Sequence, residues 1–287
     1  TEAATKYFLI QTTAAALILF SGILNTWQTG QWTINYTSTF ATTILSLALM
    51  LKLGLAPLHF WYPEVLQGTT MLTALTITTW QKLAPLAVMY MLPQLPLTIM
   101  FLMGLLSTLT GGWMGLNQTQ SRKLLAFSSI AHMGWLITAL AMSPKLAALT
   151  LMIYVLMTST MFMMLNPATK SLPDFSMNHS AYPTTTMMLF LTTMSLGGLP
   201  PLSGFVPKWL ILTELVMNKM IFLATTIALA SLPSLFFYTR ITYMALLTSP
   251  PSTPHTKHKW RLKAPTSMIL TVITTLATSL LPLTPTL

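Results

Sequence analysis

Long apolar stretches separated by short polar connectors recur from one end of the chain to the other. Nine of them approach or exceed about 20 residues, the length at which an α-helix crosses a hydrocarbon core of about 30 Å. The connectors hold residues that end helices, chiefly proline, asparagine and serine. The pattern predicts an all-α, polytopic transmembrane helix bundle in one integral membrane domain over residues 1–287, with spans at 3–23, 38–60, 69–91, 95–116, 123–142, 146–166, 184–216, 219–247 and 265–284.

Composition agrees with a lipid environment. Only 6% of the 287 residues are charged and 53% are hydrophobic, whereas a soluble domain carries about 25% charged residues. Cysteine is absent, which excludes disulfides and cysteine-ligated iron–sulfur clusters on this chain. We therefore expect the chain to bind no cofactor and no metal. Its net charge of +10 comes from scattered basic residues rather than a basic face interleaved with aromatic residues, which argues against a nucleic acid partner.

The charges in the loops predict the orientation in the membrane. With nine spans, one side holds eight basic residues and the other holds only Lys145 and Lys219. Because short loops rich in lysine and arginine stay on the inner side, that side is predicted to face the matrix or cytoplasm. The last four of the eight form one short loop that either sets the topology or also binds anionic lipid headgroups. The eight are Lys6, Arg122, Lys123, Lys170, Lys257, Lys259, Arg261 and Lys263.

Three lysines fall well inside predicted spans, namely Lys52, Lys82 and Lys208. A lysine at the centre of a bilayer costs about 2.5 to 3.5 kcal/mol. Lysines near span ends avoid this cost because their flexible stems reach the headgroups. Lys82 is roughly ten residues from either end of its span, about 15 Å at the helical rise, which is too far for that escape. These lysines are therefore predicted to face a hydrated or polar interior.

Buried lysines in a row suit proton transfer, because burial makes the protonation of an ammonium sensitive to its neighbours. His59 and His132 are candidate intermediates, since an imidazole is readily neutral near physiological pH. His59 follows Lys52 by seven residues, two helical turns. The alternative for each histidine is a hydrogen-bonded packing role. The predicted relay thus consists of Lys52, Lys82, Lys208, His59 and His132.

Proline accompanies the lysine in two spans. Pro57 follows Lys52 in the span 38–60, and Pro200, Pro201 and Pro207 precede Lys208 in the span 184–216. Each proline frees a carbonyl inside the membrane, which is tolerated only where the backbone lines a cavity or is buried in protein. Paired interrupted helices indicate the inverted repeat of antiporter-like transporters. An ordinary proline kink would explain one such span but not two that each carry a lysine.

The amino-acid sequences of several motifs resemble those of the NADH dehydrogenase subunit 2 family of vertebrate mitochondria. The resemblance covers essentially the whole chain. It is carried by MLKLGLAPLHFW (50–61), PEVLQG (63–68), TWQKLAP (79–85), GLNQTQ (115–120), RKLLAFSSI (122–130), HMGW (132–135), SLGGLPPLSGF (195–205) and PKW (207–209).

The resemblance implies a proton-pumping membrane-arm subunit of complex I (NADH:ubiquinone oxidoreductase) in the mitochondrial inner membrane. Its Lys/Arg-rich loops would lie on the matrix side, and its partners would be other membrane-arm subunits and the lipid bilayer. The lysines of the family's hydrophilic axis correspond to Lys52, Lys82 and Lys208, with His59 nearby. NADH, FMN, the iron–sulfur clusters and ubiquinone would belong to other subunits, so that no redox centre lies on this chain.

The chain departs from the family at its start. The resemblance implies two further helices upstream, the second bearing a glutamate that pairs with the lysine corresponding to Lys52, so we expect an N-terminally truncated form. None of Glu2, Glu64, Asp174 and Glu214 replaces that glutamate, because all lie in predicted loops or near span ends. Two alternatives stay open: a stand-alone cation/proton antiporter and a non-conducting structural subunit.

Overall fold

The described part of the chain is entirely helical. The computed structural model describes residues 1–34, 36–165, 183–247 and 268–279, and within them it contains helices and no strand. This confirms the predicted all-α bundle. The helices are α1 (Glu2–Thr29), α2 (Thr39–Leu53), α3 (Trp61–Gln67), α4 (Met71–Thr78), α5 (Trp80–Met91), α6 (Leu97–Gly115), α7 (Ser121–Met142), α8 (Pro144–Leu165), α10 (Pro183–Gly197), α11 (Phe205–Met217), α12 (Ile221–Leu247) and α13 (Met268–Ser279).

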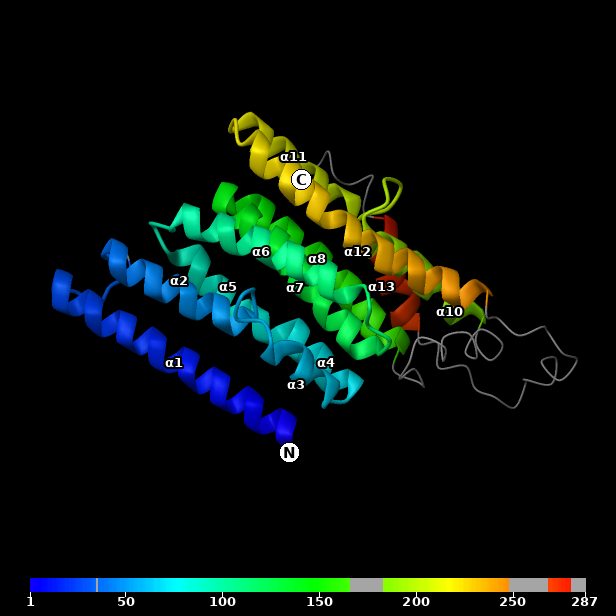
Figure 1. Cartoon of the computed structure of the whole chain (residues 1–287), viewed down its shortest axis with the longest axis horizontal. Helices are drawn as coiled ribbons and strands as arrows, with labels where there is room; N and C mark the ends of the chain where they lie inside the picture. The colour runs from blue at the N-terminus through cyan, green and yellow to red at the C-terminus, as the bar shows by residue number, and fades with distance from the viewer. Residues whose placement is uncertain (35, 166–182, 248–267, 280–287) are drawn as a thin grey trace, which may run out of the picture.

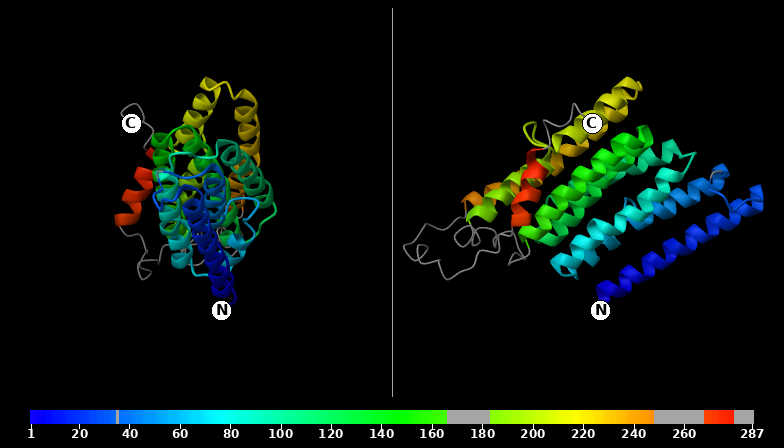
Figure 2. Two further views of the ribbon diagram at one scale, coloured as in Figure 1. Left: turned by 90° about the vertical axis from the view of Figure 1, so that its left-hand side faces the viewer. Right: turned by 180° about the vertical axis from the view of Figure 1, so that it is seen from behind.

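The long helices lie side by side with α7 near the middle (Figure 1). Helix α1 forms one edge, and the further views show it there as well (Figure 2). Helix α7 contacts α3, α4, α6, α8, α11 and α12. Most α7 side chains are buried, whereas α1 buries few. The centre of the bundle is therefore built around α7, which carries His132.

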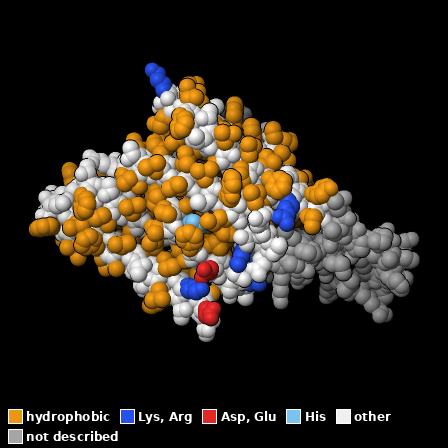
Figure 3. Space-filling model, viewed as in Figure 1, with side chains coloured by type: hydrophobic (Ala, Val, Ile, Leu, Met, Phe, Trp, Pro, Cys, Tyr) orange, Lys and Arg blue, Asp and Glu red, His pale blue; other side chains and the backbone are white. Residues whose placement is uncertain are grey.

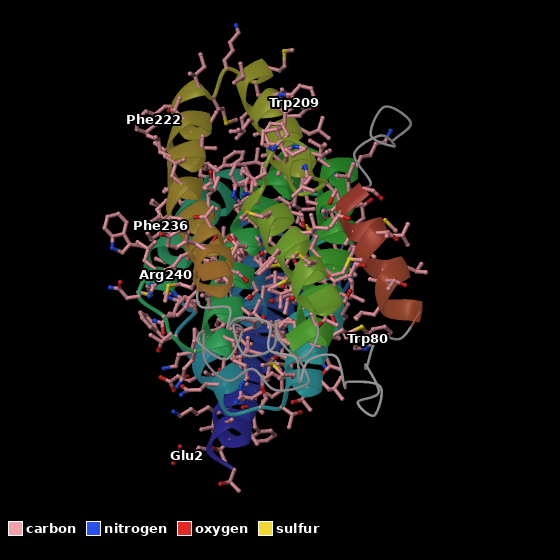
Figure 4. The ribbon with its side chains drawn as sticks, turned by 90° about the vertical axis from the view of Figure 1, so that its right-hand side faces the viewer. Glu2, Trp80, Trp209, Phe222, Phe236 and Arg240 are labelled. Carbon is pink, nitrogen blue, oxygen red and sulfur yellow. The ribbon has the colours of Figure 1, made fainter. Side chains whose placement is uncertain are left out.

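The outer surface suits lipid. Five helices are long and apolar enough to cross a membrane: Glu2–Thr29, Leu97–Gly115, Ser121–Met142, Pro144–Leu165 and Ile221–Met244. They correspond to five of the predicted spans. Hydrophobic side chains cover most of the face seen in Figure 3, and the few charged ones lie toward its margins. Trp209, Phe222 and Phe236 project outward (Figure 4) and are more than half exposed.

In two of the remaining predicted spans, 38–60 and 184–216, a helix ends next to a glycine that lies a few residues before a proline. Helix α2 ends at Leu53, because Gly54 adopts φ 73° and its N–H bonds back to the Leu51 carbonyl at 3.1 Å. Helix α10 ends in the same way at Gly197, followed by Gly198 with φ 82°. Glycine takes this left-handed conformation without the steric cost that other residues meet.

The predicted span 69–91 contains two helices and not one, a break that the sequence did not predict. Helix α4 ends at Thr78 and α5 begins at Trp80, with Thr79 at φ −113° and ψ −67° between them. No glycine or proline stands at this break. The N–H of Lys82 bonds to the Thr79 carbonyl at 3.3 Å, three residues back rather than four.

Two of the eight basic residues predicted to share one side, Lys6 and Lys123, lie at the same end of the bundle. Lys6, Glu64 and Lys123 line one polar hollow at the end of the bundle where α1 begins, and Lys6 pairs with Glu64 at 2.5 Å. Glu64 lies on α3 and not in a loop as predicted. Lys170, Lys257, Lys259, Arg261 and Lys263, together with Asp174, lie outside the described residues.

Helices α6 and α7 approach each other closely at glycines. A Cβ atom added to Gly111 would lie 2.6 Å from the Ala131 nitrogen and 2.8 Å from the Phe127 carbonyl oxygen, both of them backbone atoms of α7. Those atoms belong to a buried helix that has little freedom to move. The absence of a side chain at Gly111 therefore sets the distance between α6 and the central helix.

We predict that Gly111→Ala lowers the free energy of unfolding by about 1–3 kcal/mol, because overpacking forces the two backbones apart. Gly22→Ala in α1 is the matched control. A Cβ there meets only a Trp32 ring carbon at 3.9 Å, and the helix propensity of alanine favours it. The measurement is heat unfolding in detergent, and equal midpoints for the two variants would contradict the packing described.

Candidate functional site

Lys82 is the most deeply buried of the predicted lysines, with 3% of its surface exposed. Its Nζ donates a hydrogen bond to the Tyr154 hydroxyl at 2.9 Å. The same nitrogen lies 5.0 Å from the ring centroid of Tyr62 and 4.9 Å from that of Tyr154. A desolvated cation–π contact contributes about 2 kcal/mol or more, and a hydrogen bond to a charged group contributes about 1.5–3 kcal/mol. The Tyr62 ring and the Tyr154 hydroxyl together therefore match the cost of a lysine at the bilayer centre.

The break between α4 and α5 explains why the Tyr154 hydroxyl lies there. Because the Lys82 N–H bonds to the Thr79 carbonyl, the Thr78 carbonyl loses its usual partner in the helix. The Tyr154 hydroxyl donates to this Thr78 oxygen at 3.1 Å and accepts from the Lys82 ammonium. The distortion at Thr79 thus supplies the acceptor that orients the tyrosine toward the lysine.

Lys208 is held by a second helix break. Its Nζ donates to the Gly197 carbonyl at 2.9 Å, at the last residue of α10. The last carbonyls of a helix have no partner within it and carry the negative end of the helix dipole, so they favour a cation. Gly198 makes room for this contact, since a Cβ there would lie 3.0 Å from the ammonium nitrogen.

His132 connects the two lysines. Its ring centroid lies 5.9 Å from that of Tyr154, and its Nε2 lies 3.4 Å from the Tyr238 hydroxyl. A cavity of about 20 Å³ is lined by His132, Tyr154 and Lys208 among others. This volume holds about one water molecule, which is enough to join groups that do not touch directly.

Lys52 approaches Lys82 from the other side. It lies in the last turn of α2 and is partly buried. A cavity of about 10 Å³ lies between it and Lys82, at the lower limit for one water molecule. The cavity is lined by Tyr7, Gln11, Lys52, Trp61, Tyr62, Ile77, Gln81 and Lys82.

The structure therefore brings four of the five predicted residues into one line, Lys52, Lys82, His132 and Lys208, and places His59 apart. The His59 side chain is buried, stacks on Phe60 with ring centroids 4.4 Å apart, and has its Nε2 3.4 Å from the Met114 sulfur. It does not line either of the two cavities described above. Helix α2 ends at Leu53, so two-turn spacing from Lys52 does not hold.

Three tyrosines in the line were not predicted. Tyr62, Tyr154 and Tyr238 are each at most 3% exposed. Ser129 lies beside Tyr62 and Tyr154, and Ser128 lies beside Tyr238, both on α7. The sequence could have indicated these residues, because a tyrosine within an apolar helix needs a hydrogen-bond partner for its buried hydroxyl.

Helix α13 braces the Lys208 end of the line. The backbone N–H of Ser203 donates to the Thr278 carbonyl at 3.3 Å, and its hydroxyl donates to the Ala277 carbonyl. These two contacts hold the segment that joins α10 to α11, just before Lys208. Elsewhere, Arg240 of α12 donates to the Leu116 carbonyl at 2.6 Å and so joins α12 to the end of α6. Among the described residues no group of three or more His, Cys, Asp or Glu could hold a metal ion.

Comparison with known proteins agrees with this architecture. Residues 1–234 match the family model described as NADH:quinone oxidoreductase/Mrp antiporter, and residues 235–287 match that of the NADH dehydrogenase subunit 2 C-terminus. Respiratory complex I from Thermus thermophilus with bound aureothin contains a chain that superposes with a TM-score of 0.83 at 27% identity, over 98% of this chain and 67% of that one. A membrane-bound sulfane sulfur reductase, an archaeal respiratory membrane complex, shares the fold at a TM-score of 0.85 and 16% identity, over 99% and 63%.

Fold and family model together define an antiporter-like membrane subunit. The relatives specify which one. The chain is 50% identical to NADH-ubiquinone oxidoreductase chain 2 of Xenopus laevis over 99% of this chain and 84% of that relative. It is 51% identical to that of Varanus timorensis over the same shares of the two chains. The chain belongs to the NADH-ubiquinone oxidoreductase chain 2 family.

We predict that Gly198→Ala lowers the NADH:ubiquinone reductase activity of the assembled complex several-fold, because the new methyl group displaces the Lys208 ammonium from the Gly197 carbonyl. Gly30→Ala is the matched control. Gly30 has the same left-handed conformation, with φ 72°, but no atom lies within 4 Å of its added Cβ. Backbone strain alone would affect both variants alike, so equal losses of activity would contradict a role of the Lys208 contact.

Proposed function

We propose that this chain, as a membrane subunit of complex I, translocates protons along the line Lys52–Lys82–His132–Lys208 while electrons pass from NADH to ubiquinone on other subunits. The observation that carries the proposal is the hydrogen bond between the buried Lys82 ammonium and the Tyr154 hydroxyl. Lys82 keeps an ammonium in the membrane interior, with polar groups on both sides, although this costs free energy. Packing alone does not explain that cost, which indicates a functional role.

The proton steps follow from the contacts. Lys82 passes a proton to the Tyr154 hydroxyl, which accepts from the ammonium. The hydroxyl then turns from the Thr78 carbonyl and gives its own proton to His132 through the cavity that both residues line. His132 passes the proton on through the cavity that it shares with Lys208. Lys52 recharges Lys82 across the smaller cavity. Each cavity serves as the site of a bridging water, since hydrogen bonds through water are nearly as favourable as direct ones.

The lysines influence one another through charge. A proton that arrives on Lys52 repels the one on Lys82, because in a medium of low dielectric constant like charges act over several ångströms. The change passes on to Lys208 through His132.

The repeated helix breaks support an inverted repeat within nine membrane crossings. The N–H of Leu55 bonds to the Met50 carbonyl at 3.1 Å and that of Leu199 to the Met194 carbonyl at 3.4 Å, each five residues back. Both breaks thus have the same hydrogen-bond pattern, both contain proline, and both lie near a lysine. Two proline-interrupted helices in corresponding positions are expected of such transporters.

The proposed setting is the mitochondrial inner membrane, with the end bearing Lys6 and Lys123 toward the matrix. Other membrane-arm subunits are the proposed partners, together with lipid. Anionic headgroups would bind near Lys257, Lys259, Arg261 and Lys263. NADH, FMN, iron–sulfur clusters and ubiquinone would be bound by the rest of the complex, and this chain would carry no redox centre.

Lys82→Met tests the function. The substitution keeps an unbranched stem and removes the charge, so we expect proton pumping per NADH oxidised to fall at least tenfold in liposomes that contain the assembled complex. Lys145→Met is the matched control, because Lys145 is exposed at the start of α8. The measurement is quenching of a pH-sensitive dye at a fixed rate of NADH oxidation.

The rival functions give different results. A non-conducting structural subunit predicts unchanged pumping in Lys82→Met. A stand-alone cation/proton antiporter predicts cation-driven proton movement in liposomes that hold this chain without partner subunits. Either result would contradict the proposed function.

A further inference from the structure

We infer that the Tyr62 ring face and the Tyr154 hydroxyl form a neutral cage that keeps Lys82 charged yet dischargeable, which makes Tyr62 a positioning residue of the relay. This inference rests on the proposed function, because it explains how Lys82 can hold a proton in the membrane. Its basis is the place of the Lys82 nitrogen, 5.0 Å from the ring centroid of Tyr62 and 2.9 Å from the Tyr154 hydroxyl.

The two tyrosines contribute differently. Tyr154 supplies its hydroxyl, which accepts the hydrogen bond from Lys82 at 2.9 Å, and the nitrogen lies beyond this oxygen rather than over the ring. Tyr62 supplies its ring face to the ammonium. A cation over an aromatic face is attracted by the negative potential of the ring, and this attraction strengthens when water is excluded. Tyr62 is 2% exposed, so its ring acts under those conditions.

The charged and titratable groups around Lys82 show why a cage is needed. Tyr7 of α1 and Lys52 of α2 line the cavity next to it, Tyr62 comes from α3 and Tyr154 from α8. His132 of α7 lies beyond Tyr154 and leads to Lys208. None of these is a carboxylate. Glu64, also on α3, is half-exposed and pairs with Lys6.

Without a carboxylate among these neighbours, the Tyr62 ring face and the Tyr154 hydroxyl oxygen provide the negative potential that holds the cation. A carboxylate in such a site would bind the ammonium strongly and would oppose its discharge. The attraction of a neutral ring is weaker, so repulsion from a proton on Lys52 is sufficient to overcome it. The cage thus suits a group that must gain and lose its proton in every cycle.

The position of Tyr62 is set on several sides. Gly54 packs against its ring, since a Cβ there would lie 3.2 Å from Tyr62 Cδ2. Trp61 meets the same ring edge-on, at 5.4 Å between centroids and 88° between planes. The ion pair of Glu64 with Lys6 ties α3 to α1. Helix α3, only seven residues long, therefore holds one ring over the ammonium.

The test compares Tyr62→Phe with Tyr62→Leu in the assembled complex, with proton pumping in liposomes followed across pH. Phenylalanine keeps the ring face, so its profile should match the wild type. Leucine removes the face, which destabilises the protonated form of Lys82. Lys82 then loses its proton at lower pH, and the alkaline limb of pumping should move down by about one pH unit.

Further variants keep the test decisive. Tyr62→Met, which has similar bulk and no ring, should give the same shift if Tyr62→Leu does not assemble. Tyr243→Leu, at an exposed tyrosine of α12, should leave the profile unchanged. An unshifted alkaline limb in assembled Tyr62→Leu or Tyr62→Met would overturn the cage, as would an equal shift in Tyr62→Phe.

The two proposals fail separately. If Lys82→Met pumps normally, the relay itself is wrong. If Lys82→Met does not pump but the Tyr62 variants keep the wild-type profile, only the cage is wrong.

Discussion

The free energy of an ammonium group inside a bilayer is the constraint on which this structure depends. Lys82 and Lys208 lie within a bundle in which, among the described residues, five helices are long and apolar enough to cross a membrane. Neither can remain charged there without acceptors. For Lys208 the acceptor is the Gly197 carbonyl, at the interrupted end of α10. For Lys82 it is the Tyr154 hydroxyl of the continuous helix α8, which is oriented by the Thr78 carbonyl freed at the break between α4 and α5. The breaks are therefore part of the site and not defects in the helices.

Helix α7, in contrast to the interrupted helices, is continuous. It is buried along most of its length and packs closely against α6 at Gly111. A rigid central helix holds His132 between the Lys82 and Lys208 ends, while the interrupted helices around it present the lysines. The cavities beside His132 and beside Lys52 arise where side chains of several helices meet around these groups.

The sequence allowed the costly lysines and an interruption in two spans to be predicted, because both follow from local chemistry. The cost of burial marks Lys82. Pro57 marks the interrupted span 38–60, but the end of α2 at Gly54 was not predicted. The break at Thr79 was missed because no local residue causes it: Tyr154, which takes up the freed carbonyl, is 76 residues from Thr78. The link between His59 and Lys52 failed for the opposite reason, since a spacing argument assumed a helix that Gly54 ends. Partnerships across the bundle, such as Tyr62 with Lys82, depend on packing that a single sequence does not encode locally.

A high-resolution map of the intact complex would show whether a continuous polar line runs from Lys52 to Lys208. If it does, ordered water lies in the cavity between Lys52 and Lys82 and in the cavity shared by His132 and Lys208. Each water should lie within hydrogen-bond distance of the polar groups around it. Lipid or apolar side chains that fill either cavity, with no water between these groups, would contradict the line and the proton path built on it.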